Sequence, residues 1–259
     1  MPDPIRQIVP SGGDHPEDDG FGPDRYGESF ADVYDEWYDD ISDAEATATF
    51  ISSLGESLHV LELGVGTGRL STALAGAGHR VTGIDASQSM LDRFRGAERS
   101  VAVGADMAIL PFPDGAFDLV LVATNTLFNL HDEADQVACI HECHRVLRLG
   151  GRFVVEAMVP GEPDPSLDRL VTTKAIDVET AVLTATVRDP ESQHITGQHI
   201  EISATGIRMR PWKIRYLTLD RLDAVAASAG FRLGQRSADW DGTPATDTSA
   251  NAVSIYVAI

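Results

Sequence analysis

In the middle of the chain, short apolar segments alternate with segments whose apolar residues recur at helical spacing. The apolar segments predict five strands, at 59–64, 80–87, 100–106, 116–125 and 152–160. Helical patterns occur between them at 69–78, 87–96 and 132–151, and the last is expected to end at Gly150 and Gly151. Continuously apolar strands joined by helices predict a parallel sheet with both faces covered. Right-handed crossovers make this a doubly wound, Rossmann-like α/β fold.

The pattern changes before the first strand. Residues 25–54 predict one or two helices, because aromatic and aliphatic side chains recur at helical spacing. These side chains are Phe30, Val33, Tyr34, Trp37, Tyr38 and Ile41. Residues 1–24 are rich in Pro, Gly and Asp and show no periodicity, so we expect a mobile tail in front of a domain at 25–259.

The pattern changes again after Pro160. Four β patterns follow without a helix between them, at 169–177, 180–189, 194–203 and 206–217, so we expect an antiparallel insertion within 161–217. A helix is predicted at 219–230, with Thr218 as its N-cap and Gly230 just past its end. Two closing strands, at 231–240 and 252–259, should pair antiparallel at one edge of the main sheet.

Composition excludes several classes of protein. The 259 residues include 40 acidic and 20 basic side chains, a net charge of −20, which disfavours a nucleic-acid partner. No segment has the apolar length of a membrane span or the layout of a secretory signal, so we expect a cytoplasmic protein without a membrane partner. Cys139 and Cys143 share a face of a predicted helix that also carries His141 and His144, but their spacing is not that of a zinc site, so we expect no metal.

A glycine-rich turn follows the first predicted strand. Gly64, Gly66 and Gly68 are spaced G-x-G-x-G, whereas a dinucleotide fingerprint needs a third glycine where Arg69 stands. The turn also lacks the Lys-Ser or Lys-Thr of a P-loop. Glycines let a ligand lie against the backbone, and the following helix start offers N–H groups to an anion.

Two acids extend this site. Asp85 ends the second strand, where an acid hydrogen-bonds ribose hydroxyls, and Asp106 follows the third, where it could accept from an adenine amine. Together with the turn, they indicate an adenosine ligand with little or no phosphate.

Five segments resemble class I S-adenosylmethionine-dependent methyltransferases: "VLELGVGTGRL", "VTGIDASQSML", "GADMAILPF", "FDLVLVATNTLFNL" and "GGRFVVEA". The resemblance covers roughly residues 26–159. It implies a seven-stranded sheet whose last strand is antiparallel, and S-adenosylmethionine as the cofactor.

The resemblance also implies a set of cofactor-binding residues. The residues expected around the methionine part are Glu62, Gly64, Gly66, Gly68 and Arg69. The ribose is expected at Asp85 and Ala86, with Met90 beside it, and the adenine at Ala105, Asp106 and Met107. After the fourth strand, Thr124 and Asn125 are expected to border the cofactor. Tyr26, Tyr34 and Trp37 are expected either to reach the methionine end or only to dock their helix on the sheet.

The resemblance implies methyl transfer to nitrogen or oxygen of a small-molecule acceptor, beneath a cover formed by 161–217. Candidate catalytic residues are Asn129, which could orient the acceptor, and His131 and Glu156, which could act as bases. His131 could instead begin a surface helix, and Glu156 could be paired. Two alternative functions remain: a cofactor-binding protein without methyl transfer and an RNA methyltransferase. A homodimer is a further possibility for the assembly.

A basic stretch surrounds Trp212 in the last inserted strand. It contains Arg208, Arg210, Lys213 and Arg215. We expect a solvated face of the inserted strands; the alternative is a site for an anionic acceptor.

Overall fold

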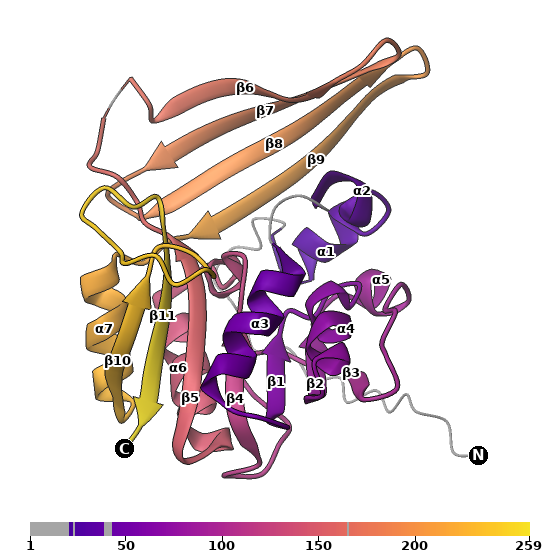
Figure 1. Cartoon of the computed structure of the whole chain (residues 1–259). Coiled ribbons are helices and arrows are strands. Elements are labelled where there is room, and N and C mark those ends of the chain that lie inside the picture. The colour runs from indigo at the N-terminus through magenta and orange to yellow at the C-terminus, as the bar shows by residue number, and fades with distance from the viewer. Residues whose placement is uncertain (1–20, 23, 39–42, 165) are drawn as a thin grey trace.

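The computed structural model describes residues 21, 22, 24–38, 43–164 and 166–259, and its centre is a seven-stranded sheet (Figure 1). The sheet order is β10-β11-β5-β4-β1-β2-β3. Its strands are β1 (His59–Leu63), β2 (Arg80–Asp85), β3 (Ser100–Gly104), β4 (Phe117–Val122), β5 (Leu147–Met158), β10 (Phe231–Ser237) and β11 (Asn251–Ala258). The pairs among β1 to β5 are parallel, whereas β11 runs antiparallel to both β5 and β10. The predicted Rossmann-like α/β fold is confirmed.

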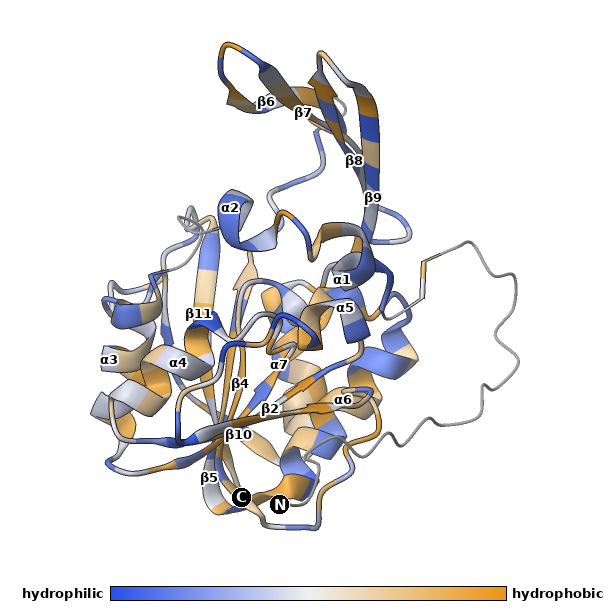
Figure 2. Ribbon diagram, turned by 90° about the vertical axis from the view of Figure 1, so that its right-hand side faces the viewer, coloured by the Kyte–Doolittle hydropathy of each residue, from blue (hydrophilic) through white to orange (hydrophobic). Residues whose placement is uncertain are grey.

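Successive residues of each central strand point to opposite faces of the sheet, and both faces are buried. Val60 and Leu119 pack under α3 (Ala44–Leu54) and α4 (Arg69–Gly76), whereas Leu61 and Val120 pack toward α6 (Glu133–Val146) and α7 (Leu219–Ser228). Figure 2 shows the two helix pairs on opposite sides of the sheet. Thr218 caps α7 as predicted, because its side chain accepts from the amide of Arg221. Burial on both faces explains why these strands read as continuously apolar.

A second sheet stands above the carboxyl ends of the parallel strands (Figure 1). It consists of β6 (Arg169–Ile176), β7 (Thr180–Asp189), β8 (His194–Ser203) and β9 (Gly206–Arg215), each antiparallel to the next. The predicted antiparallel insertion is confirmed. Near the main domain, β9 contacts the 3₁₀ helix η1 (Thr126–Asn129).

Two short helices lie between the main domain and this inserted sheet (Figure 1): α1 (Arg25–Phe30) and α2 (Tyr34–Tyr38). The Glu28 carboxylate of α1 accepts from the hydroxyls of Ser87 and Ser89, which ties α1 to α5 (Gln88–Leu91).

The described residues before β1 therefore form three helices, where one or two were predicted. Asp43 begins the third by accepting from the amide of Ala46. Of the other predictions for the N-terminal region, Ile41 and most of the tail at 1–24 lie outside the described residues.

Two predicted helices end earlier than expected. The helix at 87–96 ends at Leu91, because the chain then turns back so that the Arg95 amide reaches the carbonyl of Thr67. The helix at 132–151 ends at Val146, because Leu147 already pairs with β4. The glycine pair does not end the helix; it lies in an irregularity of β5, where Gly150 has a φ of +75°.

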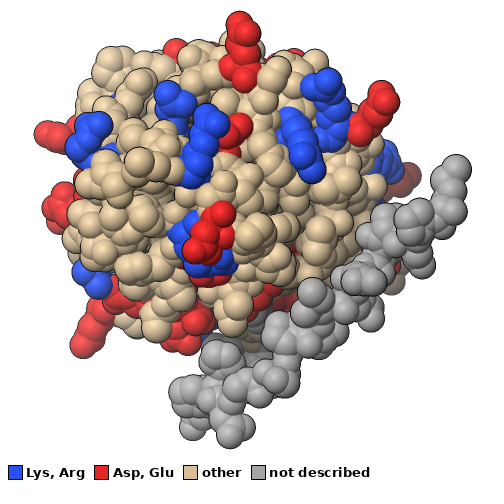
Figure 3. Space-filling view, turned by 90° about the horizontal axis from the view of Figure 1, so that it is seen from below, with Lys and Arg blue, Asp and Glu red and all other residues tan. Residues whose placement is uncertain are grey.

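On the end of the molecule opposite the inserted sheet, basic side chains are scattered among acidic ones (Figure 3). A surface that follows a nucleic-acid backbone would instead gather its basic residues into a patch or stripe. No helix within the described ranges has the length and apolar character required to cross a bilayer.

Candidate active site

The turn between β1 and α4 needs its glycines for two reasons. Gly64, Gly66 and Gly68 all have positive φ, of +71°, +55° and +92°, a region that other residues rarely adopt. At Gly66, an added Cβ would meet only the ring of Tyr34, at 3.9 Å, so the backbone here is open to a ligand. At Gly68, a Cβ would instead strike the ring of Phe94 at 2.8 Å.

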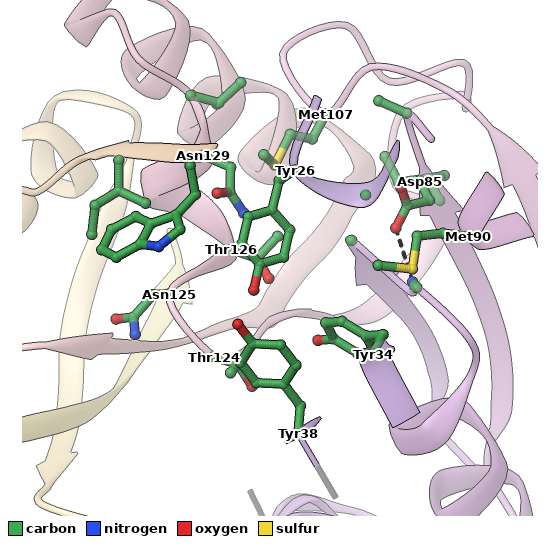
Figure 4. A pocket seen from close by; sticks show the side chains of 18 of the residues that line it. Tyr26, Tyr34, Tyr38, Asp85, Met90, Met107, Thr124, Asn125, Thr126 and Asn129 are labelled. Atoms are coloured by element: carbon green, nitrogen blue, oxygen red, sulfur yellow. Dashed lines mark hydrogen bonds between the residues drawn. The ribbon is translucent and has the colours of Figure 1, made fainter. Parts of the chain in front are cut away.

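A cavity of about 340 Å³ opens beside this turn, between the main sheet and the inserted sheet (Figure 4). Most of the predicted cofactor residues line it: Tyr26, Tyr34, Gly64, Gly66, Asp85, Ala86, Met90, Ala105, Asp106, Met107, Thr124 and Asn125. Asn129, the predicted orienting residue, lines it as well. The cavity thus lies where ligands of open α/β sheets bind, beyond the carboxyl ends of the parallel strands.

One side of the cavity carries the two acids that follow β2 and β3. The Asp85 carboxylate accepts from the backbone amides of Gly66 and Ser87, each at 2.9 Å, and burial raises its pKa. Asp106 accepts from the amide of Ala108 at 2.8 Å. Met90 lines the cavity near Asp85 (Figure 4). Acceptor oxygens beside an apolar wall fit the hydroxyls, amine and ring of an adenosine.

A small adjoining cavity of about 20 Å³ is lined in part by Glu62 and Arg69. Glu62 is buried and accepts from the Ser71 hydroxyl at 2.6 Å; burial raises its pKa to about 7, although Ser71 and Arg69 act in the opposite direction. A carboxylate and a guanidinium next to the open backbone of the turn fit the charged groups of an amino acid.

Three tyrosines from α1 and α2 border the cavity: Tyr26, Tyr34 and Tyr38 (Figure 4). Burial raises the pKa of Tyr26 and of Tyr38. Burial also raises the pKa of Tyr34, to about 12. The cavity is therefore lined by neutral phenols at physiological pH.

The inserted sheet supplies the far end of the cavity through Ile195, His199, Trp212 and Ile214. His199 is buried, and burial, with the charges of Lys174 and Arg210, lowers its pKa to about 4. The Trp212 ring lies across β8 because Gly197 has no side chain there; a Cβ would meet the ring at 2.2 Å.

His199, Trp212 and Tyr38 were not among the predicted site residues. The alternation of residues along the strands could have indicated two of them. Gly197 and His199 share one face of β8, and Trp212 of β9 pairs with Gly197. The alternation alone does not say which face of the inserted sheet is turned toward the cofactor.

Four predicted site residues do not line either cavity. Gly68 shapes the turn from behind, and Trp37 packs against Phe30, His199 and the Arg210 guanidinium. The ring nitrogens of His131 lie 3.1 and 2.9 Å from the backbone carbonyls of Phe21 and Lys213.

Glu156 is the fourth of these residues, and its carboxylate is paired. It accepts from the Thr124 amide at 2.8 Å and from the Trp240 indole at 3.0 Å. It thereby holds the chain after β4 in place. Thr124 and Asn125, with positive φ of +53° and +61°, turn there into the cavity.

The basic stretch on β9 is only in part the solvated face that was expected, because the Arg208 side chain is 60% exposed but two of its arginines are buried. Arg210 is 2% exposed and Arg215 is 8% exposed. Arg210 and Arg208 bind the Asp32 carboxylate, and Arg215 binds Glu133. These pairings occupy three of the cations on which an anionic acceptor site would depend.

Comparisons with known proteins identify the family of the chain. The methyltransferase domain family matches residues 61–155. The cypemycin N-terminal methyltransferase of a Streptomyces species is 28% identical over 233 residues, which are 88% of this chain and 95% of that protein.

Two solved structures extend the comparison to the fold. The CcbJ methyltransferase of Streptomyces caelestis is 33% identical, with a TM-score of 0.86, over 92% of this chain and 100% of that one. The S-adenosylmethionine-bound amino pentose methyltransferase CalS10 of Micromonospora echinaspora is 18% identical, with a TM-score of 0.64, over 86% and 92% of the two chains; at that identity it supports the fold alone. This chain therefore belongs to the class I S-adenosylmethionine-dependent methyltransferases, and S-adenosylmethionine is its cofactor.

Proposed function

We propose that this enzyme methylates a nitrogen or oxygen of a small molecule held between the cofactor and the inserted sheet. The observation that carries the proposal is the shape of the cavity. One end has the acids and the glycine turn, and the other is walled by side chains of β8, β9, α1 and α2. A cavity of about 340 Å³ suits a small ligand rather than a polymer.

The residues at the cofactor end have distinct proposed roles. Asp85 would accept from the ribose hydroxyls and Asp106 from the adenine amine, while Glu62 and Arg69 would pair with the charged groups of the methionine part. When bound, S-adenosylmethionine supplies a sulfonium-activated methyl group to an acceptor lone pair aligned with it. The tyrosine faces beside it are suitable neighbours for a cation. The chain's own contribution to the reaction is mostly positioning and exclusion of water.

Among the proposed acceptor atoms, the cavity favours nitrogen. Among the described residues that line the inserted-sheet end, His199 is the side chain best able to accept a proton. Its pKa of about 4 is far below the range in which general bases are effective at neutral pH. A hydroxyl has to give up its proton when it is methylated, whereas a neutral amine already presents a lone pair. The name of the cypemycin relative, an N-terminal methyltransferase, agrees with this preference.

The direct test is methyl transfer to matched acceptors. The full chain would be incubated with S-adenosylmethionine and pairs of small molecules that differ only in an amine against a hydroxyl, and S-adenosylhomocysteine would be measured by mass spectrometry. We expect product with amines at a higher rate than with the paired hydroxyls. Transfer only to bulk RNA, or to no acceptor at all, would contradict the proposal.

The cofactor part of the proposal is tested separately by calorimetry. Asp85→Ala should weaken S-adenosylmethionine binding by about tenfold or more, since it removes charge-assisted hydrogen bonds to the ribose. Asp92→Ala, which removes an exposed acid just beyond α5, is the matched control and should leave binding unchanged. Equal affinities for the two variants would contradict the role of Asp85.

A further inference from the structure

The inserted sheet turns its polar face toward the main domain. His199 and Trp212 line the cavity, and Arg210 binds Asp32 of the segment between α1 and α2. His199 pairs in register with Arg210 on one side and with Thr184 on the other, so these residues share one face of the sheet. Because successive residues of a strand point to opposite faces, the residues between them point away from the main domain.

The face that points away, here called the outer face, is apolar. Its residues are Val171 and Ile176 of β6, Leu183, Ala185 and Val187 of β7, Ile200 and Ile202 of β8, and Ile207 and Met209 of β9. Val171 and Ile207 are each 70% exposed and Met209 is 57% exposed. An antiparallel sheet with one free face normally carries polar residues on that face. Here the arrangement is reversed, which indicates that the outer face is covered when the protein is at work.

Charge is confined to one end of the outward positions. Of the described residues at these positions in β6 to β9, those that carry a charge are Arg169, Asp189, Lys213 and Arg215, and all four lie at the strand ends next to the main domain. A surface that binds anionic lipid or nucleic acid would instead gather Lys and Arg. The uncharged part of the outer face therefore fits another uncharged, apolar surface.

The size of the outer face is that of a dimer interface. Its four strands, about 4.8 Å apart, and seven residues along each, at about 3.4 Å per residue, cover about 450 Å² before the relief of the side chains is counted. Specific interfaces bury about 600–1,000 Å² of accessible surface on each partner. Since side chains that stand up from a sheet add to its accessible area, the outer face is at the lower end of this range.

We propose that a second copy of this chain packs on the outer face, so that the two inserted sheets lie face to face about a two-fold axis. An apolar patch without charge is complementary to itself, as an isologous interface requires. The inserted sheet stands above the main domain (Figure 1), so the main domains of two chains with a net charge of −20 each can stay apart. The second copy would support from behind the strands that carry His199 and Trp212.

The assembly can be measured by analytical ultracentrifugation of the full chain over about 1 to 100 µM. We expect twice the mass of one chain at the upper end. Association should become stronger with added salt, because salt screens the repulsion between two acidic chains and leaves the apolar contact in place. A chain that stays monomeric throughout would overturn the proposal, and so would association that weakens with salt, as ion pairs would.

A charge placed on the outer face tests where the contact lies. Met209→Lys should weaken association by about tenfold or more, because it buries an unpaired cation in an apolar interface. The matched control is Leu149→Lys, at the amino end of β5, where the side chain is 84% exposed; association should not change. Circular dichroism would check that both variants fold, and Ile207→Lys is a second variant on the same face. Unchanged association in the outer-face variants, or its loss in the control, would overturn the proposal.

Lipid is the competing occupant of an apolar face, and vesicles of phosphatidylcholine test it. We expect the natural chain not to sediment with the vesicles, since its outer face is already covered by the second copy. Sedimentation with the vesicles that Met209→Lys abolishes would overturn the proposal in favour of a membrane surface.

Discussion

At the residue scale, two buried titratable groups border the proposed site, Glu62 in the small adjoining cavity and His199 at the inserted-sheet end of the larger one. Glu62 at the methionine end has its pKa raised to about 7, and His199 at the inserted-sheet end has its pKa lowered to about 4. Burial is the largest cause in both, and it favours the neutral form of each group.

Glu62 should make cofactor binding depend on pH. The ionised form is the one that pairs with the cationic amino group, so affinity should rise as pH increases toward 7 and level off above it. Below pH 7, the slope should approach about tenfold per pH unit, the limit for one released proton. Calorimetry from pH 5 to 8 would compare the natural chain with Glu62→Gln. The cofactor's own titration is common to both proteins, so identical pH dependence would contradict this role.

His199 should make stability depend on pH in the acidic range. Its pKa falls from an ordinary 6.5 to about 4 on folding, so the unfolded chain binds the extra proton between these values. The free energy of unfolding should therefore decrease as pH falls from 6.5 to 4, by at most about 1.4 kcal/mol per pH unit from this group. Urea unfolding of the natural chain and of His199→Asn would measure the difference, and parallel pH curves would contradict it.

At the scale of elements, the N-terminal helices are fastened to the inserted sheet by one buried cation. Arg210 donates to both oxygens of Asp32, at 2.6 and 3.0 Å, and to the carbonyl of Ser29 at 2.6 Å. Its guanidinium also lies 5.2 Å from the centre of the Trp37 ring. Through this contact, β9 holds in place the helices that carry Tyr26, Tyr34 and Tyr38.

Breaking this contact should loosen the helices and weaken cofactor binding. Asp32→Ala leaves the buried guanidinium with only the more distant Glu201 carboxylate, at 3.5 Å, and should cost about 2–3 kcal/mol of stability. The double variant Asp32→Ala/Arg210→Met should cost less than the sum of the two single changes. Urea unfolding gives the cycle, and calorimetry the cofactor affinity.

The matched control for that cycle is Arg208→Met. Arg208 binds the same carboxylate, but its side chain is 60% exposed, so its loss should cost less than about 1 kcal/mol. Additive effects of the Asp32 and Arg210 changes, or equal costs for the two arginines, would contradict the account.

The elements were predictable wherever local pattern and tertiary context agree. Turn residues between Asp189 and His194 separate two strands that the structure pairs directly, so the insertion could be predicted from alternation and turns. The end of α6 could not, because Leu147 continues the helical pattern but is taken into β5 by pairing with Phe117. Tertiary pairing overrides the local signal there.

The cofactor end of the site was also more predictable than the acceptor end. Asp85 and Asp106 follow consecutive strands, and the topology of a parallel sheet alone brings such residues together. Tyr38 and His199 are 161 residues apart and meet only because α2 is packed under the inserted sheet. Glu156 lies in an apolar strand and resembled a buried base, but its partners Thr124 and Trp240 come from loops whose course the sequence does not reveal.

At the scale of the whole molecule, a conserved type of cofactor fold is combined with a separate cover. The main sheet and its glycine turn supply the cofactor end, and the inserted sheet with α1 and α2 closes the other end (Figure 1). This division explains why the family could be inferred from 26–159, whereas the acceptor also depends on the inserted sheet, which lies outside that range.

The most direct test of the account is a crystal structure of the full chain with S-adenosylhomocysteine. The account predicts the ribose at Asp85, the adenine at Asp106 and the amino-acid end at Glu62 and Arg69. The sulfur should face the remaining space, bounded by Tyr26, Tyr38, His199 and Trp212. An adenine against the inserted sheet, or a sulfur directed away from that space, would contradict it.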